Sequence, residues 1–211
     1  MACVRAGVEA VMTRIDHASV LPALFEDRHT TNHFTDQPVD TALVREAYEH
    51  VRWAPTAMNS QPLRLTVVES RESRERLAPH MAGFNADKTL AAPLTLIAAY
   101  DPRWHEHMPH LAPFREGFRE QWENKAELRD GMGRANALLQ IGYLTVALRA
   151  LGLEVGPMAG FSTDGVDAAF HAESGWRSLV VINVGHAASD HEKAVSPRQG
   201  RLEFDQAAQV L

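Results

Sequence analysis

The feature that most constrains the fold of this chain is a long helical pattern at residues 128–151. Its second half, ALLQIGYLTVALRAL, is apolar on nearly every side, so a helix there has to be buried on more than one face. A single small domain seldom covers two sides of one helix. We therefore expect a central helix that packs on its own sheet and also across an interface with a second copy of the chain.

Three apolar runs predict the strands of that sheet. Alternating apolar residues predict a strand that starts at Leu63 and ends near Ser70, and a continuous apolar run predicts a strand at 93–100 that is buried on both faces. A third strand is expected at 178–184, before Gly185. Residues 101–125 differ from their surroundings because they are rich in His, Trp, Phe, Arg and Glu and show weak periodicity. We expect this segment to be an insertion or lid.

Capping residues predict where the flanking helices begin. Asp40 is a favourable N-cap for a helix at 41–53, and Ser70 is one for the helix that follows it. A short helix is expected at 16–26. Gly and Pro residues after the long helix predict a loop at 152–160.

Composition fits one compact globular domain and excludes two classes of partner. The chain has 211 residues, 45% of them hydrophobic and 23% charged, with a formal net charge of −6 that leaves no broad basic face for nucleic acid. The N-terminal stretch is too short and interrupted to span a membrane, and we expect residues 1–12 to be a disordered extension, with Met12 as an alternative start. Cys3 has no partner for a disulfide, which suits a reducing cytoplasm.

Four polar segments are candidates for ligand binding. The loop 55–62 (PTAMNSQP) can present backbone amides and a side-chain amide to a flat ligand, and RHTTN at 28–32 can bind a phosphate through an arginine fork. Asn85 and Lys88 share one face of a predicted helical turn, and PRQGR forms a basic segment at 197–201. Each segment taken singly is also compatible with a solvated turn.

Taken in order, these segments resemble the motifs of the nitroreductase family of FMN-dependent oxidoreductases. RHTTNHF, PTAMNSQP, FNADK, GPMAGF and PRQGR follow the family's sequence of motifs from about Asp16 to Arg201. Residues 134–170 and the QPLR segment are most similar to the malonic semialdehyde reductase branch. The resemblance implies an α+β fold with a mixed, mostly antiparallel sheet flanked by helices, an intertwined homodimer, and a single FMN-binding domain at 13–211 with a lid at about 101–125.

The resemblance also implies which residues hold FMN. Arg28, Thr30, Arg198 and Arg201 are expected at the phosphate, Lys88 near the ribityl chain or ring edge, and Asn59 and Asn85 at the polar edge of the ring. The loop 157–160 is expected to direct an amide at flavin N5. The full set of cofactor-binding candidates is Arg28, His29, Thr30, Asn32, Pro55, Thr56, Ala57, Asn59, Gln61, Asn85, Lys88, Pro157, Met158, Ala159, Gly160, Arg198 and Arg201.

This chain departs from the family pattern at two of those positions. Ala159 stands where nitroreductases proper often carry Glu, so a contact there is expected from the backbone amide. Asn32 replaces a basic residue found in some members.

The activity implied by the resemblance is ping-pong reduction, in which NADH or NADPH reduces FMN and a small-molecule substrate then takes the hydride from flavin N5. No catalytic side chain is expected. For the closest branch the substrate is malonic semialdehyde, which is reduced to 3-hydroxypropionate, and its carboxylate could meet Arg103, Arg115 or Arg119 in the lid. The alternatives are a broad-specificity nitro, quinone or enone reductase and a flavin-binding protein without turnover.

The sequence does not support a dinucleotide-binding site or a metal site. Gly152, Gly156 and Gly160 follow a helix, whereas a dinucleotide-binding fingerprint needs its glycines between a strand and a helix. His105, His107 and His110 lack the helical register of a metal site, so no metal is expected.

Overall fold

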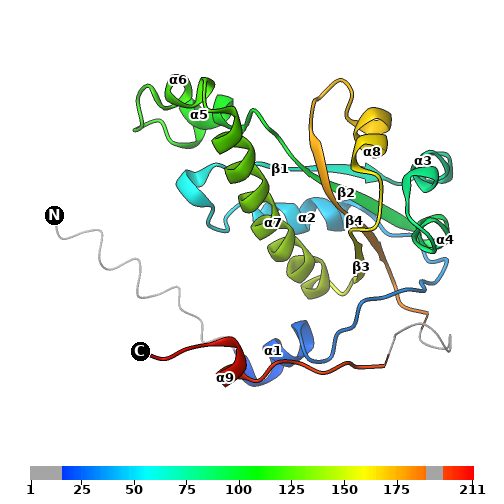
Figure 1. The fold of residues 1–211 in the computed structure, drawn as a ribbon. Helices are drawn as coiled ribbons and strands as arrows, with labels where there is room; N and C mark the ends of the chain where they lie inside the picture. The colour runs from blue at the N-terminus through cyan, green and yellow to red at the C-terminus, as the bar shows by residue number, and fades with distance from the viewer. Residues whose placement is uncertain (1–15, 189–196) are drawn as a thin grey trace.

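A computed structural model of the chain describes residues 16–188 and 197–211, so the expected N-terminal extension lies outside the described residues. Its centre is one sheet with the order β1-β2-β4-β3 (Figure 1). The strands are β1 (Leu63–Val68), β2 (Leu94–Tyr100), β3 (Glu154–Met158) and β4 (Arg177–Gly185), and every neighbouring pair is antiparallel. The predicted α+β class is confirmed.

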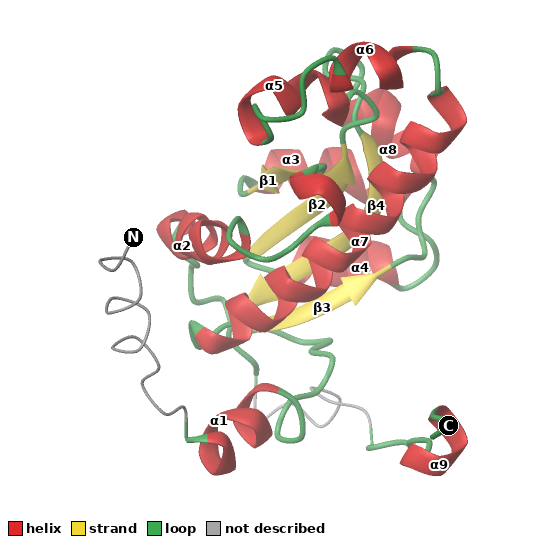
Figure 2. Cartoon of the chain, turned by 90° about the vertical axis from the view of Figure 1, so that its left-hand side faces the viewer, coloured by secondary structure: helices red, strands yellow, loops and turns green. Residues whose placement is uncertain are grey.

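Helices cover both faces of this sheet (Figures 1 and 2). The long helix α7 (Ala126–Ala150) and α2 (Thr41–Val51) pack on one face, while α3 (Arg71–Leu77), α4 (Asn85–Ala91) and α8 (Thr163–Phe170) lie on the other. The larger core joins α2 and α7 to the sheet, and a second cluster lies under α3 and α8. All of β2 is buried, as its continuous apolar run predicts.

The central helix α7 is covered on one side only. Ile141, Leu144 and Leu148 are buried against the sheet and α2. Leu138 and Leu139 on the same helix remain 43% and 45% exposed within the described chain. A single copy of the chain therefore leaves part of the apolar surface of α7 uncovered.

Residues 154–158 correct the expectation of a loop at 152–160, because they form β3. Gly156 and Pro157 obscure the strand in the sequence, since both residues weaken ordinary strand patterns. Pro157 is tolerated because β3 is an edge strand that pairs only with β4.

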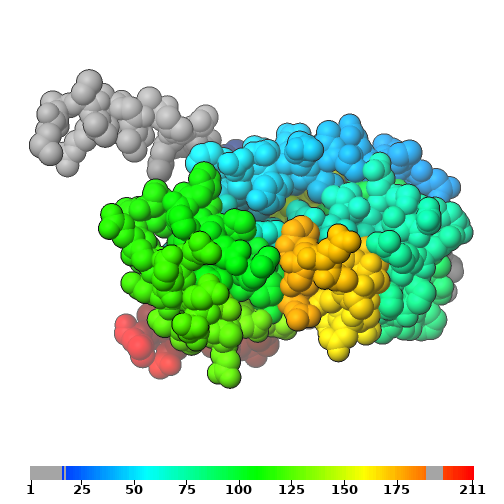
Figure 3. Space-filling model, turned by 90° about the horizontal axis from the view of Figure 1, so that it is seen from above, coloured from blue at the N-terminus to red at the C-terminus, as the bar shows by residue number. Residues whose placement is uncertain are grey.

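The segment 101–125 is more organised than its weak periodicity indicates. It contains η3 (Trp104–His107), α5 (Met108–Leu111) and α6 (Phe118–Glu123). Trp104 is fully buried and its ring centroid lies 5.3 Å from that of Trp122, within a cluster that also holds Met108 and Phe118. Seen from above, the green residues of this segment and of α7 form one side of the molecule, next to the yellow and orange residues of α8 and β4 (Figure 3).

Two segments from the ends of the chain lie below the sheet (Figure 1), and their helices are apart from each other in the turned view (Figure 2). They contain α1 (His17–Leu24) and α9 (Phe204–Ala207). The short 3-10 helices η1 (Ala57–Asn59) and η2 (Ala78–His80) complete the described elements. None of the helices in residues 16–188 and 197–211 has the length and apolar character needed to cross a membrane.

Candidate cofactor site

A cavity of about 600 Å³ opens between the segment after α1 and the C-terminal segment. We call it the arginine cavity because Arg28, Arg149, Arg198 and Arg201 all line it. Glu26 is the acidic residue among its lining residues. The predicted residues brought together here are Arg28, His29, Thr30, Asn32, Arg198 and Arg201. This excess of guanidinium groups suits a phosphate or another small anion.

Arg28, which lines this cavity, is held in a fixed orientation by contacts with three other residues. Its Nε donates to the carbonyl oxygen of Ala23 at 2.7 Å, its Nη1 forms an ion pair with Glu154, and its Nη2 lies 3.4 Å from the carbonyl oxygen of Arg149. The Thr31 hydroxyl donates to the second carboxylate oxygen of Glu154 at 3.3 Å. Glu154 therefore offsets part of the positive charge of Arg28 while orienting its guanidinium.

The C-terminal segment supplies the other wall of the arginine cavity. Arg198 donates through Nη2 to the carbonyl oxygen of Glu26 and lies 3.1 Å from Nε2 of His29. Arg201 donates through Nη1 to the carbonyl oxygens of Gln199 at 3.1 Å and Gly200 at 2.9 Å. The contacts of Arg198 join two segments that lie far apart in the sequence, whereas those of Arg201 stay within its own segment.

A smaller cavity of about 170 Å³ adjoins the first, since Thr30 and Asn32 line both. We call it the adjoining cavity. The other predicted residues that line it are Asn85, Lys88, Pro157 and Met158. Asn85 donates through Nδ2 to the carbonyl oxygen of Gly160 at 3.1 Å, which ties α4 to the end of the segment 157–160. Ala159 is exposed next to this contact.

Gly156 explains how the segment 28–32 reaches the sheet. The Thr31 amide donates to the carbonyl oxygen of Val155 at 3.0 Å, and a Cβ at Gly156 would lie only 2.5 Å from the carbonyl oxygen of Thr31. Only glycine permits this approach without a backbone shift. The close contact sets Thr30 and Asn32 at the junction of the two cavities.

The loop 55–61 lies elsewhere in the described chain, since none of its residues lines either cavity. The Ala57 amide donates to Oδ1 of Asn136 at 2.7 Å, and Asn59 donates through Nδ2 to the carbonyl oxygen of Leu111 at 2.9 Å. Met58, Asn59 and Gln61 have φ values of 58°, 58° and 42°. Non-glycine residues in this region are strained, and such strain is concentrated at functional sites. Two groups of predicted site residues are therefore separated within one copy.

Two further contacts stabilise the loop 55–61 internally. The amide of Gln61 donates to the hydroxyl oxygen of Thr56 at 3.3 Å. The side chain of Gln61 donates through Nε2 to Oδ1 of Asn59 at 2.8 Å.

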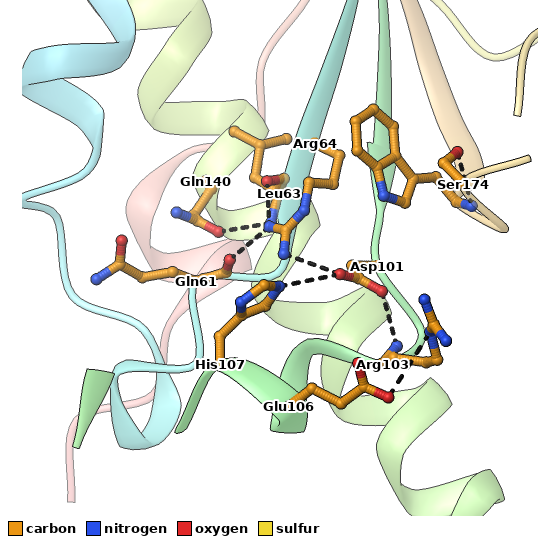
Figure 4. Close-up of polar contacts among 10 residues, drawn as sticks. Gln61, Leu63, Arg64, Asp101, Arg103, Glu106, His107, Gln140 and Ser174 are labelled. Carbon is orange, nitrogen blue, oxygen red and sulfur yellow. Dashed lines mark hydrogen bonds and ion pairs between the residues drawn. The ribbon is translucent and has the colours of Figure 1, made fainter. Parts of the chain in front are cut away.

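Arg64 connects this loop to the segment 101–125 (Figure 4). Its Nη1 donates to the carbonyl oxygen of Gln61 at 3.1 Å, and its Nη2 pairs with the Asp101 carboxylate at 2.9 Å. His107 lies 3.4 Å from the same carboxylate. Gln61, Arg64, Asp101 and His107 line a third, more apolar cavity of about 680 Å³. These contacts join the loop 55–61 to the segment 101–125.

The three arginines predicted to meet a substrate carboxylate line none of these three cavities. They are Arg103, Arg115 and Arg119. Arg103 is exposed and lies 3.9 Å from Glu106, and Arg119 is exposed on α6. Arg115 lies over the rings of Phe114 and Phe118, at 5.6 and 5.9 Å from their centroids. All three guanidinium groups are exposed on the segment 101–125 and do not line the arginine cavity.

Several residues at the two cavities carry no recognisable signal in the sequence. Arg149 lines the arginine cavity, Glu154 pairs with Arg28, and Gly156 and Asn183 line the adjoining cavity. Arg149 gave no signal because it falls in the last turn of a helix, where a cation is favourable for the helix dipole alone. The acidic partner of Arg28 lies 126 residues away along the chain, so no local pattern could reveal it.

Comparisons with known proteins show which family the chain belongs to. The nitroreductase family model matches residues 25–186. A Streptomyces coelicolor protein provisionally named NADH dehydrogenase/NAD(P)H nitroreductase is 45% identical over 166 residues, which are 79% of this chain and 82% of that protein. A Leptothrix cholodnii protein with the same provisional name is 42% identical over 200 residues, which are 95% of this chain and 100% of that protein.

Solved structures have the same fold. A nitroreductase family protein from Streptococcus pneumoniae has a TM-score of 0.75 and 26% identity, over 90% of this chain and 100% of that one. A provisionally named nitroreductase from Exiguobacterium sibiricum, solved in complex with FMN, has a TM-score of 0.77 and 20% identity, over 93% of this chain and 98% of that one.

Proposed function

Because the chain belongs to the nitroreductase family, we propose that it is an NAD(P)H-dependent oxidoreductase that holds FMN in the arginine cavity and the adjoining cavity. The observation that carries this proposal is the meeting of four predicted segments, 28–32, 85–88, 157–160 and 197–201, around two connected cavities. The assignment of FMN also draws on the FMN complex of the Exiguobacterium neighbour. We propose that the domain spans residues 13–211 and acts in the cytoplasm.

The arginine cavity fits the phosphate of FMN by charge. Guanidinium groups bind phosphate oxygens through charge-assisted hydrogen bonds, which are stronger than neutral ones. Arg28 is already oriented by Ala23 and Glu154, so little side-chain freedom is lost when an anion binds. Arg198 and Arg201 close the opposite wall.

The adjoining cavity would receive the part of the cofactor that leads from the phosphate to the ring. Its Asn85 and Lys88 supply an amide and a cation, and the segment 157–160 supplies backbone groups beside them. FMN supplies the hydride chemistry when bound, while the protein holds the phosphate, orients the ring and sets the charge near it. A cavity of about 170 Å³ is smaller than usual ligand pockets of roughly 300–1,000 Å³, so the ring needs a further wall.

We propose that a second copy of the chain supplies this wall through its loop 55–61. The loop is preformed, with the Ala57 amide and the Asn59 side chain bonded to α7 and the lid, yet it lies away from both cavities of its own copy. Leu138 and Leu139 on α7 offer an uncovered apolar surface for dimer formation. Light scattering of the flavin-loaded protein should give a dimer mass, and a stable flavin-loaded monomer would contradict the shared site.

The cofactor assignment is tested by the flavin that the protein releases on denaturation. We expect FMN, because the two cavities provide one cluster of cations for one phosphate group. Release of FAD, or failure to reconstitute the protein with any flavin, would contradict the proposal.

We propose a short aldehyde acid, malonic semialdehyde, as the substrate that best matches the resemblance of residues 134–170 and QPLR to that branch. The second candidate is broad reduction of nitro compounds, and it is favoured by the NAD(P)H nitroreductase names of the relatives at 45% and 42% identity. The aldehyde acid carries a carboxylate, whereas the nitro substrates of the second candidate need no anionic group. A cation near the ring therefore distinguishes the two functions.

The substrate proposal is tested by comparing malonic semialdehyde, an uncharged aldehyde of similar size and a quinone. The wild type is measured beside the Arg103→Ala, Arg115→Ala and Arg119→Ala variants. Loss of one charge-assisted contact should lower kcat/KM for the acid by about 10- to 100-fold in at least one variant, with little change for the uncharged aldehyde. Equal rates for both aldehydes in the wild type, or faster turnover of the quinone, would favour the broad-specificity reductase.

A further inference from the structure

Arg149 stands out in the arginine cavity because no motif of the sequence points to it. It belongs to the last turn of α7, while the predicted cations of the cavity come from the segments 28–32 and 197–201. The carbonyl oxygen of Arg149 accepts from Arg28, so these two residues are neighbours in the lining of the cavity.

The guanidinium of Arg149 is only partly satisfied. Its Nη1 donates to the carbonyl oxygen of Leu24, at the C-terminal end of α1, at 3.2 Å. Its Nε is buried and has no hydrogen-bond partner among the described residues. A buried donor without an acceptor is costly, which is why such groups are rare in native proteins.

Arg149 also differs from Arg28 in its charge balance. Arg28 forms an ion pair with Glu154, whereas Arg149 has no carboxylate within ion-pair distance in the described part of the chain. Burial lowers the pKa of Arg149, and the carboxylate of Glu154 opposes this effect from a distance while Arg28 adds to it. An anion that enters the cavity would compensate this desolvated positive charge.

We propose that Arg149 is a direct ligand of the phosphate monoester of FMN, in addition to the arginines of the two recognised segments. This inference rests on the proposed function, since it assumes that the flavin phosphate occupies the arginine cavity. Leu24 and the end of α1 orient the guanidinium, and Glu154 holds Arg28 beside it without neutralising Arg149 directly.

The alternative role of Arg149 is purely structural, because its bond to Leu24 also attaches α1 to α7. Riboflavin separates the two roles, since it has the ring and ribityl chain of FMN but no phosphate. A phosphate ligand affects the binding of FMN alone. A structural tether affects both flavins together.

The test measures dissociation constants for FMN and riboflavin by fluorescence titration of the full-length apoprotein. We expect Arg149→Met to raise the constant for FMN by about 10- to 100-fold, the range for one charge-assisted contact, and to leave that for riboflavin within about twofold. Arg149→Gln removes the charge but keeps a hydrogen-bond donor for the carbonyl oxygen of Leu24. The same result is expected for this variant, which replaces the Met variant if that one does not fold. Arg71→Met is the matched control, because Arg71 is exposed on α3 and bonds only to Glu75 in the described chain.

Equal weakening of both flavins in the Arg149 variants, or no change for FMN, would overturn the inference. Arg201→Ala separates this failure from that of the proposed function. If Arg201→Ala loses the preference for FMN while Arg149→Met and Arg149→Gln keep it, only the role of Arg149 is wrong. If the wild type binds riboflavin as tightly as FMN, the phosphate position and the role of Arg149 are both wrong.

Discussion

Replacement of Gly156 by alanine tests the contact that places the segment 28–32 against the sheet. The added Cβ would lie 2.5 Å from the carbonyl oxygen of Thr31 and 3.8 Å from Cβ of Asn183. The first distance is far inside van der Waals contact and the obstructing atom belongs to the backbone, so the segment around Thr31 has to move. Overpacking of this kind costs about 1–3 kcal/mol of unfolding free energy.

The expected result follows from that cost and from the position of the segment. For a domain of about 150–250 residues, each kcal/mol lowers the Tm by roughly 2–4 °C, so Gly156→Ala should lower it by about 2–12 °C. FMN binding should weaken as well, because Thr30 and Asn32 on either side of Thr31 line both cavities. Calorimetry and flavin titration on the same preparations measure the two effects.

Gly131→Ala is the control for this prediction. Gly131 lies in α7 with open space around its Cβ position, and alanine favours a helix over glycine by about 1 kcal/mol, so this variant should keep or raise the Tm. A Gly156→Ala variant that matches the wild type in both Tm and FMN affinity would refute the packing of residues 28–32 on β3.

Two further predictions concern stability away from the cofactor. Burial lowers the pKa of His171, so the unfolded state binds protons more tightly and the unfolding free energy should fall as the pH drops below about 6.5. Urea unfolding across this range should show a smaller fall for His171→Asn, and identical pH slopes would exclude His171 as the cause. Trp104→Ala should lower the free energy of unfolding by about 3–5 kcal/mol. The ring of Trp104 is fully buried and packs on Trp122, and its Nε1 donates to the carbonyl oxygen of Arg129. Chemical unfolding measures this loss, and a cost below about 1 kcal/mol would mean that Trp104 is not packed in the cluster with Met108 and Phe118.

The helices whose first turn is capped by an adjacent side chain could be predicted from local signals in the sequence. Asp40 accepts from the Ala42 amide at 2.8 Å and starts α2, and Ser70 accepts from the Ser73 amide at 3.1 Å and starts α3. The buried strand β2 follows from its unbroken apolar run. These features depend on neighbours within a few positions, so a single sequence is enough to recognise them.

Features that depend on distant partners could not be predicted in the same way. The strand β3 contains Gly156 and Pro157 and is defined by its pairing with β4. The predicted binding segments resemble known motifs, but their gathering around two cavities depends on contacts such as that of Thr31 with Val155. The separation of the loop 55–61 from those cavities could be seen only once the chain was folded.

As a member of the nitroreductase family, this protein is expected to carry FMN and to pass electrons from NAD(P)H to an oxidised substrate. The most direct test of this expectation is an anaerobic stopped-flow experiment on the FMN-loaded protein, which follows the absorbance of oxidised flavin. We expect NADH or NADPH to bleach this absorbance, and an oxidised substrate added afterwards to restore it within the turnover time. A flavin that stays oxidised with both nucleotides, or that no oxidant from the aldehyde, nitro and quinone classes restores, would contradict this expectation.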